Sequence, residues 1–245
     1  MHLIFGRSNL LRCLLVFLIG IPSGLGFSIV LPQIARYYFA FVAHRVASTM
    51  GTPAGVPLGV SHVLIIVANN LIPVIVGFSL PALIASYNLY YSTHHPERYS
   101  STAPRLGAVE SKRPASRLGS EIYNNLSAFA FVVAFVFGFL VFGAFFGYFL
   151  ISGGLPLLEK ALNVIAPHAP FEIAATLMSA SVALGLRDSL LQQIDSGVGS
   201  SDLSKHIRQL LRSKRMAISL ALVVLLVCLG AIVEVYVSAP LARAG

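Results

Sequence analysis

The sequence is poor in charged residues. Only 11% of its 245 residues are Asp, Glu, Lys or Arg, whereas soluble domains average about 25%. Tryptophan is absent, and 56% of the residues are hydrophobic. The mean hydropathy of +0.82 points in the same direction. This composition excludes an ordinary soluble domain, so the length of the chain is best counted in membrane spans.

Cysteine is nearly absent, which excludes a disulfide framework and a thiolate metal site. Cys13 and Cys228 both lie in apolar runs without metal-ligand spacing, and we interpret them as small buried side chains. A P-loop is also missing, so any use of ATP would need another subunit. The net charge of +8 comes without a basic aromatic module, so we expect no nucleic-acid partner.

Long apolar runs are abundant. A span needs about 20 mostly apolar residues, and it must be helical because lipid offers no partner for backbone N–H and C=O groups. We therefore predict an all-α fold, a polytopic transmembrane helix bundle that forms a single integral membrane domain over residues 1–245. The five predicted spans cover roughly residues 13–33, 71–91, 126–151, 162–186 and 216–237. The first is interpreted as a retained span, since it is long and lacks a small-x-small cleavage site.

Lys and Arg are distributed unevenly between the predicted spans. Thirteen fall on one side of such a bundle and four on the other. Because positive charge collects in cytoplasmic loops, we predict a multi-pass protein of the cell membrane, with its N-terminus in the cytoplasm and its C-terminus outside. The predicted cytoplasmic loops are residues 92–121, which are rich in Pro and Ser, and residues 187–215. The first of these loops is expected to be weakly ordered.

The second cytoplasmic loop carries a helical pattern. Leu203, Ile207, Leu210 and Leu211 recur at helical spacing among basic residues. This pattern predicts a short amphipathic helix on the inner leaflet, or alternatively a contact with a partner. In the third span, Gly143 and Gly147 form a G-x-x-x-G pair that allows helices to approach closely. That pair is compatible both with packing inside the bundle and with dimerisation.

Polar residues interrupt three of the apolar runs. His168 and Glu172 lie near the start of the fourth, Glu234 lies near the end of the fifth, and Asn69 and Asn70 precede the second. The predicted orientation places all of them in the outer half of the membrane. A charge inside a span costs at least about 2.5–3.5 kcal/mol, so such residues normally face the bundle interior and find partners. We therefore predict that these side chains form one polar cluster.

The cluster has an architectural interpretation and a binding interpretation. Pro170 suits the first position of a helix, where Glu172 would complement the positive end of the helix dipole. The Asn69–Asn70 pair would then cap the second span. In the binding interpretation the cluster holds a ligand, an ion or a partner. Thr176 and Ser179 follow Glu172 on the same helical face and would extend a polar stripe inward.

Catalysis is not expected. The spacing of His168 and Glu172 is not the H-E-x-x-H zinc pattern, and a third metal ligand is not evident in the sequence. No Ser or Cys nucleophile has a plausible base beside it. We therefore expect a protein that is not an enzyme, without catalytic residues, metal or cofactor. The best enzymatic alternative would be an intramembrane metalloprotease.

Three blocks of sequence carry a family likeness. They are ANNLIPVIVGFSLPALIASYN with Asn69, Asn70, Gly77 and Asn88, APHAPFEIAATLMSASVALGLR with Pro167, His168, Glu172, Gly185 and Leu186, and LGAIVEVYVSAP with Ile232, Glu234, Ser238 and Pro240. With these blocks the chain resembles the stage II sporulation protein M family of polytopic membrane proteins. It departs from the family pattern at Ala169, which replaces a glycine, and at the additional Pro170.

The resemblance implies a non-enzymatic function. Sporulation members of the family are membrane scaffolds that work with peptidoglycan-cleaving partners, and other members occur in organisms that form no spores. For this chain it implies an integral membrane scaffold, or a subunit of a membrane assembly, with the lipid bilayer and protein partners or further copies around it. The alternative is a transport or permease component that binds an ion or small solute. A wet cavity reaching Glu172 and Glu234 would favour transport, and a dry, fully paired cluster would favour the scaffold.

Overall fold

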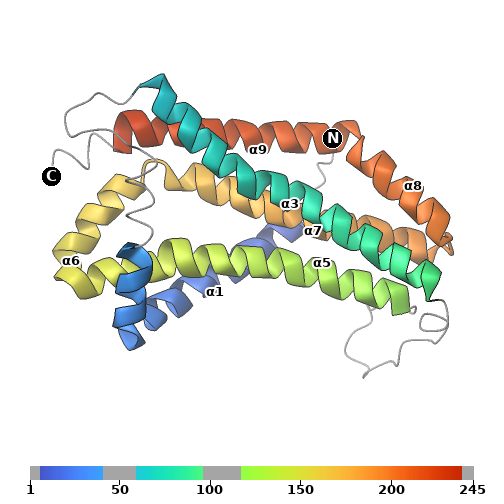
Figure 1. Cartoon of the computed structure of the whole chain (residues 1–245), viewed down its shortest axis with the longest axis horizontal. Coiled ribbons are helices and arrows are strands. Elements are labelled where there is room, and N and C mark those ends of the chain that lie inside the picture. Colours follow the sequence, from blue (N-terminus) through green and yellow to red (C-terminus); the bar gives the residue numbers. More distant parts are fainter. Residues whose placement is uncertain (1–5, 41–58, 96–116, 239–245) are drawn as a thin grey trace.

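The computed structural model describes residues 6–40, 59–95 and 117–238, and within these ranges it contains helices and no strands (Figure 1). The α-helices whose bounds lie within these ranges are α1 (Arg7–Val30), α3 (Val60–His94), α5 (Arg117–Val136), α6 (Phe145–Ile165), α7 (Ala169–Asp195), α8 (Ser200–Leu211) and α9 (Lys214–Val233). Residues 32–40 are also helical. Two π-helical stretches are η1 (Phe137–Ala144) and η2 (Glu234–Ser238). The predicted all-α fold is confirmed.

Five helical stretches are long and apolar enough to cross a membrane. They are Arg7–Val30, His62–His94, Arg117–Ile165, Ala169–Asp195 and Lys214–Ser238. Their number confirms the predicted polytopic bundle. The direction in which they cross the membrane stays a prediction.

Helix α3 is longer than the predicted second span. Its 35 residues extend over about 52 Å, which exceeds the bilayer core of about 30 Å. The helix begins after its N-cap residue Gly59, so Asn69 and Asn70 lie within it. The interpretation of these two asparagines as a helix cap is therefore wrong, because the apolar stretch before them continues the same helix.

Helix α7 is the central helix of the bundle and contacts α1, α3, α5 and α9 (Figure 1). In its most apolar window 61% of the residues are buried, against 24% to 33% in the other four spans. Its buried residues include the small side chains of Ala175, Ser179, Ala180 and Ala183. Small residues let helix backbones approach each other where lipid gives no hydrophobic driving force for association.

Helix α1 crosses η1 with the two backbones in contact. A Cβ atom on Gly20 would lie 2.5 Å from the carbonyl oxygen of Phe135, and one on Gly24 would overlap that of Phe139. From the other side, a Cβ atom on Gly138 would overlap a carbonyl oxygen of α1. Only glycine fits at these positions, so the crossing is fixed by the sequence.

The G-x-x-x-G pair faces the same crossing. A Cβ atom on Gly143 would overlap the carbonyl oxygen of Ile21, and one on Gly147 would lie 2.5 Å from the Cβ of Ser28. The hydroxyl of Ser28 donates a hydrogen bond to the carbonyl oxygen of Ala144 at 3.0 Å. Packing inside the bundle therefore uses the face that the sequence left open to dimerisation.

The segment after η1 remains helical beyond the predicted third span. Gly154 has φ 68° and ψ −161° and interrupts α6 with a kink, in a backbone region that favours glycine. Helix α6 turns away from α5 at one end of the molecule, and the chain then enters α7 (Figure 1). We call this the α6 end of the bundle.

Helix α8 lies at the opposite end and connects α7 to α9 (Figure 1). Its side chains Leu203 and Ile207 are 1% and 2% exposed and join a core cluster with Leu89, Leu126 and Leu190. The helix was predicted from its amphipathic pattern, and its position at the inner leaflet stays a prediction, but the lipid contact expected of Leu203 and Ile207 was wrong. Their apolar face packs against the bundle instead of lipid.

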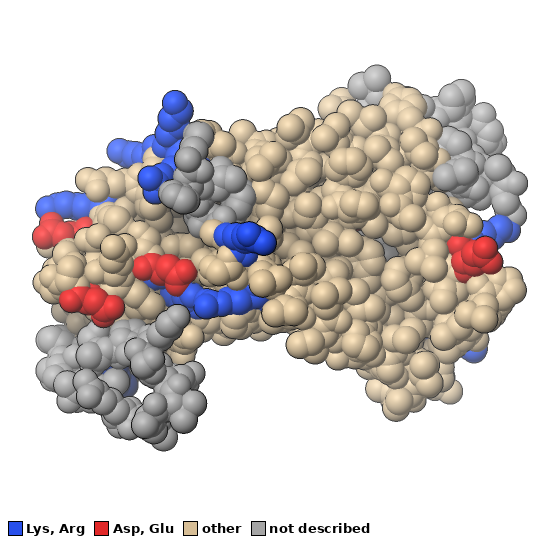
Figure 2. Space-filling model, turned by 180° about the vertical axis from the view of Figure 1, so that it is seen from behind, with Lys and Arg blue, Asp and Glu red and all other residues tan. Residues whose placement is uncertain are grey.

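Charged side chains of both signs gather at the α8 end, whereas the middle of the visible face is almost free of charge (Figure 2). The start of α1, the start of α5, the end of α7, α8 and the start of α9 lie at this end (Figure 1). These segments contain Arg7, Arg12, Arg117, Arg187, Lys205, Arg208, Arg212, Lys214 and Arg215. The Lys and Arg residues that are unevenly distributed along the sequence are therefore also concentrated at one end of the bundle.

One of these basic residues is buried. Arg187 was predicted to lie in a loop, yet it belongs to α7 and is 4% exposed. Its Nε and Nη2 donate to Oδ1 of Asp188 at 2.9 and 2.5 Å, and its Nη1 donates to Oγ of Ser127 at 2.8 Å. Asp188 Oδ2 also accepts a hydrogen bond from Nδ2 of Asn9 at 2.9 Å. This network joins α1, α5 and α7.

The glycine crossing gives a first prediction. The substitution Gly24→Ala should destabilise the protein by about 1–3 kcal/mol, the usual cost of overpacking a core. The matched control is Gly26→Ala on the same helix, where an added Cβ meets nothing within 4 Å. The measurement is the temperature at which half of the protein in detergent is no longer monodisperse. We expect this midpoint temperature to fall only for Gly24→Ala. Equal midpoints for both variants would contradict the backbone crossing.

The network of Arg187 gives a second prediction. Asp188→Asn leaves a buried guanidinium without its counter-charge. We expect a loss of about 1.5 kcal/mol, at the low end for hydrogen bonds to charged groups, because the Asp188 side chain is 48% exposed. Asp195→Asn, an exposed position near the end of the same helix, serves as the control. The same heat-stability measurement checks it, and a loss equal in both variants would show that the network contributes no stability.

Candidate functional site

His168 lies in the short link between α6 and α7. Its backbone N–H donates to the carbonyl oxygen of Ile165 at 3.1 Å, and its own carbonyl accepts from Phe171 at 3.1 Å. Pro170 then occupies the first turn of α7, where its missing N–H has no helical partner to lose. Glu172 follows in that first turn. The local sequence thus places an imidazole and a carboxylate side by side at the start of the central helix.

Glu234 lies where α9 ends and the π-helical stretch η2 begins. A π-helical turn contains an extra residue and changes the direction of the side chains it carries, and such turns are frequent at functional sites. Ser238 closes the same stretch, and its Oγ lies 2.8 Å from Nδ1 of His168. The end of the last span is therefore attached to the link before α7.

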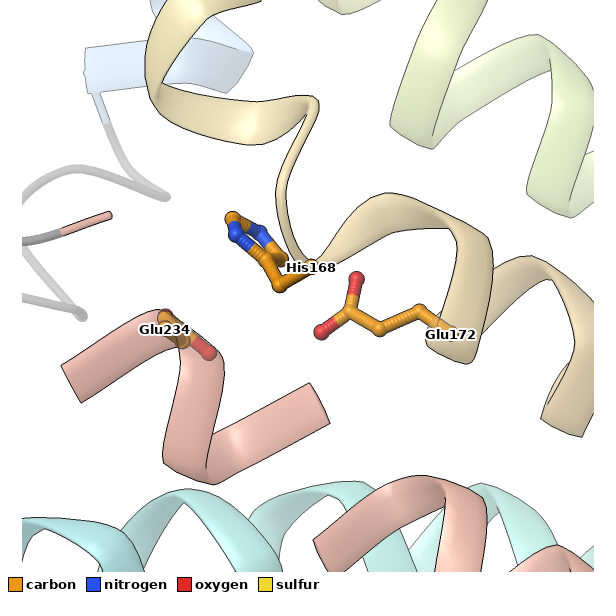
Figure 3. Close-up of side chains that lie close together, drawn as sticks. All are labelled: His168, Glu172 and Glu234. Atoms are coloured by element: carbon orange, nitrogen blue, oxygen red, sulfur yellow. The ribbon is translucent and has the colours of Figure 1, made fainter. Parts of the chain in front are cut away.

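The three ionisable side chains meet between α7 and η2 (Figure 3). One nitrogen or oxygen atom each from His168, Glu172 and Glu234 lie within 4.8 Å of one another. In Figure 3 the carboxylate of Glu172 points toward the other two residues. Residues from two spans that are distant in the sequence thus form one compact group.

Asn70 joins this group from α3. Its Nδ2 donates a hydrogen bond to Oε1 of Glu172 at 3.3 Å. Asn69 precedes it in the same helix, and its side chain lies outside the described part of the structure. Of the five residues predicted to cluster, the structure thus brings together Asn70, His168, Glu172 and Glu234.

The electrostatic setting of the group is unusual. Burial lowers the pKa of His168 below its ordinary value, which favours the neutral imidazole. Within the described ranges, neither Glu172 nor Glu234 forms a salt bridge with Lys or Arg. Two carboxylates therefore face each other inside an apolar bundle, and no cationic side chain among the described residues balances them.

A cavity of about 530 Å³ reaches the group from one side. The polar residues in its wall are Tyr38, Asn70, Glu172, Thr176 and Ser179, and the rest of the wall is mainly aliphatic and aromatic. Thr176 and Ser179 thus continue inward from Glu172, as the stripe in the sequence indicated. Glu234 is not among the residues that line the cavity.

The structure also shows two serine–histidine pairs that the sequence analysis missed. One is His168 with Ser238, and the other is Oγ of Ser189 with Nε2 of His206 at 2.8 Å. Each pair joins different helical segments, so no local motif announces it. Ser238 is 1% exposed, which leaves its hydroxyl closed to a substrate. For His206, the described residues provide no carboxylate hydrogen-bonded to the other ring nitrogen, which a catalytic triad would need.

Comparisons with known proteins give one positive result. The family model described as stage II sporulation protein M matches residues 71–239. The matched region runs from α3 through η2 and includes His168, Glu172 and Glu234. Searches of the curated proteins and of the solved structures found no match. Because the family match covers more than half of the chain, the chain belongs to the stage II sporulation protein M family, as the three sequence blocks predicted.

Proposed function

We propose that this chain is a non-enzymatic scaffold of the cell membrane, an integral subunit that holds together a larger membrane assembly. Membership of the stage II sporulation protein M family and the five apolar spans support this proposal. The observation that carries it is the dense packing of the bundle between the polar cluster and the α8 end.

That packing ends the polar stripe. Thr176 and Ser179 extend inward from Glu172, but the following turns of α7 contribute Leu186 and Leu190, which are 1% and 0% exposed. These leucines belong to the same core as Leu203 of α8. A solute that crossed the membrane through this chain would need polar groups along the whole path. The packing instead favours a rigid element that positions neighbours.

The cavity does not meet the condition for a transport site. It reaches Glu172 and not Glu234, and its wall is mainly apolar. Transport would also need the second carboxylate to be open to the same space. The cluster is not fully paired either, so the choice of a scaffold rests on the family and on the packing of the bundle.

The outer faces of the helices offer surface to neighbours. In α3 only 24% of the apolar window is buried, and Ile72, Ile75, Leu83 and Tyr87 are each at least 60% exposed. Lipid or the spans of other subunits can cover such a face, since van der Waals packing drives helix association in membranes. We expect protein partners or further copies of the chain on these faces.

The assembly can be tested in native membranes. We expect the chain, extracted with a lipid-retaining polymer and measured by native mass spectrometry, to occur mainly in complexes heavier than its monomer mass of 26.2 kDa. A second polypeptide in a fixed ratio, or a fixed number of copies, would be the expected composition. Recovery of the monomer alone from native membranes would contradict the scaffold proposal.

The orientation can be tested by cysteine labelling. In a background with Cys13 and Cys228 replaced by alanine, Ser201→Cys places a thiol on α8, and Asn163→Cys places one near the end of α6. Both positions are exposed. With the basic α8 end in the cytoplasm, an impermeant maleimide should label intact cells only at position 163. Labelling at position 201 alone would show that the orientation is the opposite of the predicted one.

A further inference from the structure

We propose that His168, Glu172 and Glu234 form a binding site for one divalent transition-metal ion of the Zn²⁺ type, which ties the start of α7 to the end of α9. No metal was expected from the sequence, because no third ligand was evident beside His168 and Glu172. The fold supplies Glu234 as that third ligand. This site goes beyond the scaffold proposal and does not depend on it.

The donor atoms are close enough for a shared ion. Zn²⁺ binds imidazole nitrogen and carboxylate oxygen at about 2.0–2.2 Å, which places two ligand atoms about 3.4 Å apart in a tetrahedral site. The donor atoms of this group lie within 4.8 Å of one another. Small side-chain rotations of the two flexible glutamates close the remaining distance. His168 lies in the link before α7, Glu172 in the first turn of α7 and Glu234 at the end of α9, so the fold already brings the three residues together.

Two of the three ligands are already oriented by hydrogen bonds. Oγ of Ser238 lies 2.8 Å from Nδ1 of His168. When Nδ1 carries the proton and donates it to this hydroxyl, the lone pair of Nε2 is left for a cation. Oε1 of Glu172 accepts a hydrogen bond from Asn70 at 3.3 Å, which leaves its second oxygen available. Metal-binding histidines and carboxylates commonly have such supporting partners.

The charge of the group fits a divalent cation. Two ionised carboxylates in a membrane-embedded bundle are costly unless they find a partner. In the part of the chain that the structure describes, neither has a Lys or Arg partner. One divalent ion bound by Glu172 and Glu234 makes the group neutral and removes their mutual repulsion.

The ligand types select the class of metal. One imidazole and two carboxylates form a mixed nitrogen and oxygen set. Thiolates, which favour Cu⁺, are not part of it. Ca²⁺ takes six to eight oxygen ligands and Mg²⁺ keeps several waters, which fits this set less well. Three protein ligands leave one position of a tetrahedral Zn²⁺ open.

The direct test is metal binding by the whole purified chain in lipid nanodiscs. The protein carries no polyhistidine tag, is stripped with a chelator and is titrated with Zn²⁺. Calorimetry gives the affinity, and elemental mass spectrometry after gel filtration gives the number of ions per chain. We expect about one tightly bound Zn²⁺ per chain, and Co²⁺ at the same site should show the visible absorption bands of a four-coordinate or five-coordinate ion.

The variants locate the site. Glu172→Gln and Glu234→Gln each remove a ligand charge while keeping the shape, and each should weaken Zn²⁺ binding by at least about 100-fold. Asn70→Ala should weaken it by about 10–100-fold, the usual effect of losing a supporting hydrogen bond. Glu159→Gln, an exposed position on α6, is the matched control and should bind like the wild type. Gel filtration confirms that each variant is folded.

Two results would overturn the proposal. One is wild-type protein that binds no Zn²⁺, Co²⁺ or Mn²⁺ at concentrations up to about 100 μM. The other is binding that is unchanged in both Glu172→Gln and Glu234→Gln, which would place the ion at other histidines. If the three side chains only hold the helix ends together, each variant should change the heat stability by the same amount with and without Zn²⁺. The metal site predicts that Zn²⁺ stabilises only the wild type and the Glu159→Gln control.

Discussion

The bundle depends on how closely its backbones can approach. In lipid a leucine side chain gains nothing by leaving the solvent for a neighbouring helix, so association rests on van der Waals contact and hydrogen bonds. The chain meets this constraint with small residues along α7 and with glycines where α1 crosses η1. Gly77 of α3 belongs to the same device, since a Cβ atom there would lie 2.8 Å from the Cβ of Ser179. These contacts determine where every other helix lies.

The polar group follows from that arrangement. Close packing of α3 and α9 around α7 places the first turn of α7 between Asn70 and Glu234. The π-helical stretch η2 then carries both Glu234 and Ser238, and both lie beside the link that holds His168. Glu172 therefore does two things at once. It complements the dipole of α7 from its first turn, as the architectural interpretation held, and it faces a second carboxylate across the helix interface.

The helices could be predicted from the sequence because a span must satisfy its backbone hydrogen bonds internally, and long continuous apolar runs do so as helices. Hydropathy alone therefore gave the all-α fold and the number of spans, and the sequence blocks gave the family. Helix ends were harder to predict. Helix α3 begins before Asn69, and α6 continues after Gly154. Hydropathy indicates which residues can enter lipid, but it does not indicate where a helix begins or ends. Arg187 was assigned to a loop because a charged residue was expected to end the apolar run. The sequence does not show the buried partners with which its guanidinium forms hydrogen bonds.

The candidate site was only partly visible in the sequence. The orientation argument placed Asn70, His168, Glu172 and Glu234 at one depth. It could not show that they touch, because depth along a helix says nothing about which face points inward. The contact of Ser238 with His168 and the pair of Ser189 with His206 were missed for the same reason. Such pairs depend on the rotation of each helix about its axis, which only the packed bundle determines.

The buried arginine also has a consequence for the order of events during synthesis. Ser127, which binds Arg187, and Asn9, which binds its partner Asp188, belong to helices that precede α7 in the chain. Both have therefore already been made when Arg187 leaves the ribosome. The guanidinium can pass directly from the aqueous phase to its partners. Glu172 is in the opposite position, because Glu234 and Ser238 are made last. One end of the bundle can therefore close while translation continues, whereas the other stays open until the final helix is in the membrane.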